Sequence, residues 1–311
     1  MGANQHFVPK GYLKGFTIPY QYSDKFIWVY KKKSGINPEK RSIKKVSSQE
    51  NYYAQEDEHG NVEPDKLENA ISQVENLALP IIQRINTCEN IVILNGDEFG
   101  HLAYFIGLSL ARVPSFRNPI SEMLKKVVET TANNMLNRGE FSEPPPKLKE
   151  YFEAGGRLKA EIKPWASLEP MLQISDVLAQ SIIKKKWTFF TPYKGQTFIT
   201  SDNPVIFYQD NRFRGVPMGP AHPMATILYP MRRDLALMCS LDEREHEGIE
   251  AGALENEKHI NIKCSSKNET LFFKERVILA ARENVYADYF SHPLKKLVWS
   301  REGTEQTILT E

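Results

Sequence analysis

Residues 187–208 read WTFFTPYKGQTFITSDNPVIFY. The stretch contains three short runs of β-branched and aromatic residues, at Trp187–Phe190, Thr197–Thr200 and Val205–Tyr208. Residues of these types favour strands, and the Lys194–Gly195 pair between the first two runs is typical of a hairpin turn. Gly, Pro and Asn separate the runs, so the stretch predicts several short strands in one sheet.

The elements on either side of this stretch are segregated by type. Downstream, strands are expected at Thr226–Tyr229, Leu235–Leu241 and Leu297–Ser300, and a helix is expected over Glu275–Ala287. Upstream, apolar residues recur at helical spacing in four segments, at residues 67–85, 95–113, 119–136 and 167–185. Segregated elements favour an α+β fold over a doubly wound one. We therefore expect a helical central region packed on a mostly antiparallel sheet, which the C-terminal half largely forms.

Composition supports a folded chain without extreme charge. Hydrophobic residues make up 41% of the 311 residues, which is enough for a core and excludes bulk disorder. Lys and Arg number 40 and Asp and Glu 39, which excludes a strongly cationic nucleic-acid coat protein and an acidic tail protein. We expect a single compact domain over residues 1–311, with a helix-rich part at about 64–186 and a strand-rich part at about 187–300.

Three cysteines, Cys88, Cys239 and Cys264, are too few and too scattered for a disulfide framework or a structural zinc site. Residues 1–6 show no basic segment followed by an apolar run, so we expect no signal peptide. The longest apolar stretch, Leu102–Val113, is too short and too polar to span a bilayer. The sequence thus predicts a cytoplasmic protein with no membrane partner. It contains neither a phosphate-binding P-loop motif nor a dinucleotide-binding glycine motif.

Two polar stretches are unusual for a purely structural protein. Gln5 and His6 precede an apolar segment that continues to Phe16, so the imidazole of His6 is expected to be held in place on the core. The plain alternative is a histidine that hydrogen-bonds the backbone. Thr200–Pro204 places a carboxylate, an amide and a hydroxyl between two strand runs, although these residue types also form ordinary structural turns.

At these residues the chain resembles a bacterial family catalogued only as a domain of unknown function. The family pattern Q-H-x-V-P-x-x-Y-L-x-x-F matches Gln5–Phe16, and F-I-T-S-D-N-P-V matches Phe198–Val205. Weaker matches lie between and after these motifs, at Glu68 and Glu75, at Arg112, Pro114 and Arg117, and at Asn284 with Tyr289 and Ser291. The resemblance runs over nearly the whole chain and implies no reaction. It does imply that these scattered polar residues belong to one site.

The residue types in this set indicate acid–base chemistry on an anionic substrate. His6 is a candidate general acid or base, because its ordinary pKa is roughly 6.5. Asp202 and Glu75 are candidates to hold a divalent cation or to orient His6. Arg112 is a candidate to neutralise a phosphate or carboxylate, and its plain alternative is a buried ion pair with Glu68 or Glu75. The candidate substrate-binding residues are Gln5, Ser201, Asn203 and Asn284.

These candidates suit phosphodiester or N-glycosidic chemistry, so the leading hypothesis is a nuclease-type hydrolase that acts on nucleic acid or nucleotides. Lys31–Lys45 and Lys184–Lys186 would then make secondary phosphate contacts. Mg²⁺ or Mn²⁺ would be the cofactor if the carboxylates hold a metal ion. The main alternative is a non-catalytic ligand- or protein-binding module, and a third is a nucleotide- or sugar-modifying transferase. The catalytic hypothesis predicts that His6 and Asp202 converge in one cleft.

Overall fold

The computed structural model describes residues 4–19, 25–57, 59–63, 65–140, 146–209, 218–242 and 257–303. Within these ranges, the central strands are buried on both faces. The six-stranded sheet has the order β10-β11-β12-β8-β13-β7, and all its pairings are antiparallel except that of β13 with β8. Its strands are β7 (Ile91–Asn95), β8 (Lys186–Thr191), β10 (Ile206–Gln209), β11 (Ala225–Arg232), β12 (Leu235–Ser240) and β13 (Glu257–Cys264).

Alternate residues of these strands enter two different hydrophobic clusters. Phe189 packs in the larger cluster with residues of the central helices, whereas its neighbour Phe190 packs in the smaller cluster with Phe273 and Phe198. Successive side chains of a strand point to opposite faces, so a strand covered on both sides needs an unbroken apolar run. This requirement explains the sequence WTFF at the start of the strand-rich half.

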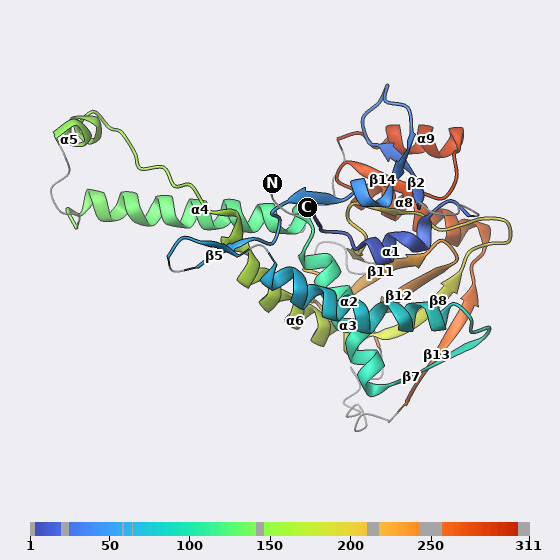
Figure 1. Cartoon of the computed structure of the whole chain (residues 1–311). Coiled ribbons are helices and arrows are strands. Elements are labelled where there is room, and N and C mark those ends of the chain that lie inside the picture. Colours follow the sequence, from blue (N-terminus) through green and yellow to red (C-terminus); the bar gives the residue numbers. More distant parts are fainter. Residues whose placement is uncertain are drawn as a thin grey trace.

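Helices of the central region cover one face of this sheet (Figure 1). They are α2 (Lys66–Ile85), α3 (Gly96–Ala111) and α6 (Leu168–Ile183), with η3 (Pro164–Ser167) leading into α6. Asn95 caps α3 in a capping box with Glu98. Helix α4 (Pro114–Asn137) projects from the rest of the molecule and carries α5 (Pro146–Glu153) at its far end (Figure 1). It begins at Pro114, earlier than expected, because this proline occupies its first turn.

A smaller sheet lies on the other side of the molecule, with the order β3-β2-β14-β9. Its strands and the helices beside it are β2 (Phe26–Lys31), β3 (Glu39–Ser42), β9 (Thr200–Ser201), β14 (Asn284–Ala287), α8 (Lys267–Ala280) and α9 (His292–Trp299). The short N-terminal elements are β1 (Asn4–His6), α1 (Lys10–Leu13), η1 (Lys14–Phe16), η2 (Ile43–Lys45), β4 (Ser48–Glu50), β5 (Gln55–Glu56) and β6 (Val62–Glu63).

This arrangement confirms the α+β prediction, including a mostly antiparallel sheet built largely by the C-terminal half. Three local predictions were wrong. The strand expected at Thr197–Thr200 is only β9, which pairs with β14 in the smaller sheet and therefore forms no hairpin with β8. The helix expected over Glu275–Ala287 ends at Ala280, because Ala281 has extended backbone and residues 284–287 form β14. The strand expected at Leu297–Ser300 is the end of α9, which Ser291 caps through the N–H of Leu294. None of the described helices has both the length and the hydrophobicity that a membrane span requires.

Helices α3 and α6 pack closely because α3 has a glycine at their contact. A Cβ at Gly107 would lie 2.8 Å from the carbonyl oxygen of Ser175 and 3.2 Å from the backbone nitrogen of Ala179. Gly100 lies in the same helix, and a Cβ there would meet no atom within 4 Å. Substitutions at these two glycines therefore distinguish the effect of helix propensity on stability from the effect of packing.

We expect Gly107→Ala to lower the free energy of unfolding by about 2 kcal/mol, because the added methyl group forces the two helices apart. Gly100→Ala should raise it by about 0.5–1 kcal/mol, because alanine favours the helix over glycine. Equilibrium unfolding in urea measures both values. Equal effects of the two substitutions would show that α3 and α6 do not meet at Gly107.

Candidate functional site

His6 is held by backbone contacts at the N-terminal edge of the molecule. Strand β1 pairs with β4, which places His6 opposite Ser48, and Nε2 of His6 lies 3.2 Å from the carbonyl oxygen of Ile43. A carbonyl oxygen only accepts hydrogen bonds, so Nε2 carries the proton and Nδ1 keeps its lone pair. Burial lowers the pKa of His6 below its ordinary value of 6.5. The imidazole is therefore mainly neutral at pH 7 and is suited to accept a proton.

Gln5 and Tyr53 hold the segment that carries His6 through buried hydrogen bonds. The side-chain oxygen of Gln5 accepts a hydrogen bond from the backbone N–H of Tyr53 at 2.6 Å. The Tyr53 hydroxyl donates to the carbonyl oxygen of His6 at 3.2 Å. Both residues are buried. These hydrogen bonds position the segment that carries His6.

Arg112 ends α3 with its side chain completely buried. Its Nη1 donates to Oε1 of Glu75 at 2.9 Å. Its Nε and Nη2 are buried and have no hydrogen-bond partner among the described residues. These two N–H groups lie along one edge of the planar guanidinium, the edge that binds a carboxylate or phosphate with two parallel hydrogen bonds. The side chain thus has one nitrogen in an ion pair and a complete bidentate edge without a protein partner.

Two hydroxyl groups near Arg112 also lack partners in the described part of the chain. They belong to Tyr229 on β11 and Ser109 on α3. Burial raises the pKa of Tyr229, and the positive charge of Arg112 partly opposes that rise. The Ser109 hydroxyl lies close enough to the Tyr229 hydroxyl to lower its pKa, yet the two groups do not meet in hydrogen-bond geometry. Buried polar groups are nearly always hydrogen-bonded, so this concentration of unsatisfied donors points to a ligand.

Two carboxylates lie at the outer side of this cluster. Glu68 and Glu75 are seven residues apart on α2 and share one face of the helix, where both are partly exposed. Burial raises the pKa of Glu68, and the negative charge of Glu75 raises it further. One oxygen of Glu68, Oε2, is buried without a partner among the described residues. Glu68 is therefore a carboxyl group that holds a proton more readily than usual, within electrostatic range of Arg112.

Asp202 has a different environment. Its Oδ1 accepts the backbone N–H of Arg282, and its Oδ2 accepts the backbone N–H groups of Glu283 and Asn284, each at 2.8 Å. These three N–H groups follow the end of α8, so the carboxylate turns the chain from the helix into β14. The backbone N–H of Asp202 in turn donates to the carbonyl oxygen of Asn284.

The other polar residues of this motif are also engaged with the backbone. Ser201 Oγ donates to the carbonyl oxygen of Asn203, and the Asn203 amide donates to the carbonyl oxygen of Ala280. The Asn284 amide lies 3.4 Å from Oδ2 of Asp202. Ser201, Asp202, Asn203 and Asn284 thus form a structural clamp between β9 and β14, which corresponds to the plain reading of this turn.

The structure therefore divides the predicted site into two parts. It brings His6, Glu75 and Arg112 together, with Gln5 behind them. The side chains of the clamp around Asp202 make no described hydrogen bond to these residues, and the hydrogen bond between Ser47 Oγ and the Tyr286 hydroxyl, at 2.7 Å, links the two parts. Contrary to expectation, the oxygens of Asp202 face the backbone of residues 282–284 rather than His6. In the described residues, no group of three or more His, Cys, Asp or Glu side chains is placed to hold a metal ion.

Sequence reasoning missed Ser109 and Tyr229 and gave Glu68 no catalytic role. The spacing of Glu68 and Glu75 was a detectable signal, because seven residues return to the same helix face. Ser109 also offered a weak signal as a hydroxyl between Leu108 and Leu110 in an apolar helix. Tyr229 offered none, because a tyrosine in a buried strand is ordinary.

Asp202 makes the stability of the protein depend on pH. Burial raises its pKa from 3.8 to about 6, although the three backbone hydrogen bonds lower it. The folded protein thus binds this proton more tightly than the unfolded chain. The stability that protonation contributes is present below about pH 4 and is lost as the pH rises through about 6. Asp202→Asn, which cannot ionise, is the reference.

We expect the free energy of unfolding of the wild type, relative to Asp202→Asn, to fall by about 3 kcal/mol between about pH 3 and pH 7. Urea unfolding of both proteins at several pH values gives this difference. A difference that is constant with pH, or that grows as the pH rises, would contradict a raised pKa for Asp202.

Comparison with known proteins supports the family assignment. The curated proteins contain no match to this chain, and neither do the solved structures. The family model described as "Protein of unknown function (DUF4238)" matches residues 4–288, which include His6, Arg112, Asp202 and Asn284. This match covers most of the 311 residues and confirms the resemblance noted in the sequence. The chain belongs to the DUF4238 family of proteins of unknown function.

Proposed function

We propose that this protein is a nuclease-type hydrolase whose active site is the cluster of His6, Glu68, Glu75 and Arg112. The observation that carries the proposal is the unpartnered edge of the Arg112 guanidinium, buried beside two unpartnered hydroxyl groups. A phosphate group presents several acceptor oxygens and matches this set of donors. Glu75 supports the arrangement by holding Nη1 and by balancing the buried charge.

The proposed reaction uses His6 and Glu68 as a base and an acid. Water attacks the phosphorus of a phosphate ester while its proton passes to Nδ1 of His6. The bond from phosphorus to the leaving oxygen breaks, and Glu68 gives that oxygen its proton. The guanidinium of Arg112 and the hydroxyls of Tyr229 and Ser109 stabilise the non-bridging oxygens as their charge increases. Opposite pKa shifts of His6 and Glu68 support these assignments.

A cleavage assay tests the proposal. The purified protein is incubated with labelled single- and double-stranded RNA and DNA, with Mg²⁺ or Mn²⁺ and separately with EDTA. The EDTA arm decides whether a divalent cation takes part. Cleavage that is lost in folded variants of the cluster would support the proposal. Failure to cleave any of these substrates under all conditions would contradict it.

Arg112→Lys should lower kcat/KM at least about 100-fold, because lysine keeps the charge and loses the bidentate edge. Arg117→Lys is a matched control, since Arg117 is also buried but donates to Ser167, Tyr52 and Pro164. It should lower stability and leave kcat/KM within a few-fold of the wild type. Circular dichroism and thermal unfolding verify that both variants fold. Equal losses of activity in the two folded variants would remove Arg112 from the site.

The pH dependence should report both titrating groups. His6 must be deprotonated and Glu68 protonated, so kcat/KM should follow a bell-shaped curve with an optimum below pH 7. The acid limb belongs to His6, and the alkaline limb belongs to Glu68. In Glu68→Gln the alkaline limb should disappear while the residual rate falls. Rates measured over about pH 4–9 test this, and an unchanged alkaline limb in Glu68→Gln would assign that limb to another group.

One observation favours the alternative of a non-catalytic binding module. Helix α4 projects from the molecule and exposes Met123, Val127 and Val128, which lie within two turns of each other (Figure 1). An exposed apolar helix face is typical of a protein-binding surface. In that case the Arg112 cluster would hold an anionic ligand without turnover. Phosphate-dependent stabilisation of the protein without cleavage of any substrate would favour this alternative.

A further inference from the structure

Positive charge is concentrated in two segments that pack together. Residues 25–45 and 282–302 contain twelve Lys and Arg and only four Asp and Glu, whereas the whole chain has a net charge of +1. The first segment forms β2, β3 and η2, and the second contains β14 and α9. Strand β14 pairs with β2, and the side-chain amine of Lys295 on α9 lies 3.4 Å from the side-chain oxygen of Asn37. One of the twelve, Lys32, is turned inward and donates to the carbonyl oxygens of Leu279 and Ala281. The remaining charges make the two segments one basic region on a chain that is elsewhere acidic.

Aromatic rings lie among these charges. The Trp28 ring is 5.1 Å from the ring of Phe290, which is 41% exposed, and the Phe290 ring is 4.8 Å from that of His292. Lys40 is opposite Trp28 in the β2–β3 pairing, with its amine 5.5 Å from the centre of the indole. The amine of Lys295 is 4.7 Å from the Trp299 ring. We call this set of six residues the basic-aromatic face: Trp28, Lys40, Phe290, His292, Lys295 and Trp299.

We infer that the basic-aromatic face binds single-stranded nucleic acid. Lysine amines contact backbone phosphates, and exposed rings stack on unpaired bases, so alternating amines and rings suit a strand whose bases are accessible. Duplex DNA and RNA bury their base faces and cannot use Phe290 or Trp28 in this way. Other acidic partners would use the charge alone and would gain nothing from the rings.

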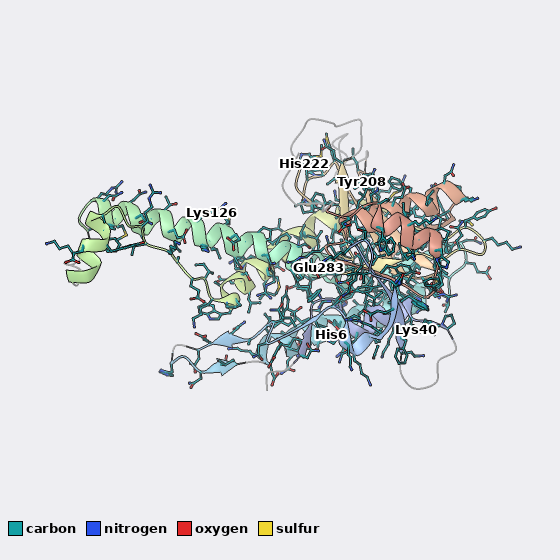
Figure 2. All side chains as sticks on the ribbon, turned by 90° about the horizontal axis from the view of Figure 1, so that it is seen from above. His6, Lys40, Lys126, Tyr208, His222 and Glu283 are labelled. Carbon is teal, nitrogen blue, oxygen red and sulfur yellow. The ribbon has the colours of Figure 1, made fainter. Side chains whose placement is uncertain are left out.

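The face is continuous with the proposed active site. Lys40 lies in β3, which is followed directly by η2 with Lys44 and Lys45. The first residue of η2, Ile43, contacts Nε2 of His6 through its carbonyl oxygen. Figure 2 shows His6 and Lys40 along the same edge of the molecule, whereas Lys126 lies far out on α4. A strand bound on the basic-aromatic face would thus reach His6 by passing over η2.

The three lysines of Lys184–Lys186 differ in exposure, because Lys184 and Lys186 are exposed and Lys185 is buried. The amine of Lys185 is turned inward and donates to the carbonyl oxygens of His222, Pro223 and Ala225 at 2.8–2.9 Å. Burial lowers its pKa to about 8. Lys185 therefore supports the loop before β11 and does not make the phosphate contact expected from the sequence.

Fluorescence anisotropy with labelled single-stranded oligonucleotides tests the inference. EDTA is present and every protein carries His6→Gln, so that neither a metal ion nor the proposed general base supports cleavage of the probe. We expect Phe290→Ala to raise Kd about tenfold for single strands and to leave duplex binding unchanged. Lys40→Glu with Lys295→Glu should raise Kd further and reduce the slope of log Kd against log salt by about two. The matched controls are Trp165→Ala and Lys126→Glu, which remove an exposed ring and an exposed amine elsewhere and should change neither value.

The choice of ligand rests on the proposed function, yet binding is measured without cleavage, so the two fail separately. Single-strand binding that depends on Phe290, in a protein that cleaves nothing, would support this face and overturn the hydrolase. Cleavage of single strands that the face variants do not affect would overturn the inference about the face and would still support the hydrolase proposal. Equal effects of Phe290→Ala and Trp165→Ala on Kd would also overturn the inference that the basic-aromatic face binds single strands. Binding only to vesicles of phosphatidylcholine and phosphatidylserine would replace the nucleic acid with a membrane surface.

Discussion

Arg112 carries a positive charge into the core at the point where α3 ends, and Glu75 is the carboxylate that compensates it. A buried charge without a partner is strongly destabilising, so α2 and α3 must keep the register that joins these two residues. Tyr53 and Tyr229 pack near the same guanidinium and bring the N-terminal segment and β11 to it. The ion pair thus determines where four separate parts of the chain meet.

That pair satisfies only part of the guanidinium. One nitrogen bonds Glu75, and the other two belong to an edge that has no partner in the described residues. Arg117 shows what a purely structural buried arginine looks like in the same chain, because it bonds Ser167, Tyr52 and Pro164 and stacks on the Tyr52 ring. The contrast between these two arginines, five residues apart, is the main reason for assigning Arg112 to a ligand.

Much of the fold was predictable because local patterns agreed with the final packing. The WTFF run is continuous because both faces of β8 are buried, and Asn95 precedes α3 as a cap. One error arose where a distant group decides the local structure. The backbone of residues 282–284 leaves the helix because the Asp202 carboxylate, about eighty positions earlier, binds its N–H groups. The helix propensity of the residues around Glu275 does not indicate this contact.

Most residues of the candidate site could be predicted from the sequence, but their arrangement in space could not. The motifs located His6, Glu75, Arg112 and Asp202, but the sequence cannot tell which carboxylate faces a guanidinium and which faces the backbone. Ser109 and Tyr229 were missed for the same reason, because an unsatisfied hydroxyl is a property of the packed core. The sequence therefore did not show which of these residues form the clamp and which form the binding site.

NMR of the arginine side chains shows whether the unpartnered edge of Arg112 binds an oxyanion. The Nε–H signals of Arg112 and Arg117 are observed while inorganic phosphate is added to the full-length protein, with assignments from the two Lys variants. We expect the Arg112 signal to shift and saturate while the Arg117 signal stays in place. An Arg112 signal that does not move at any phosphate concentration, or that moves together with Arg117, would contradict it.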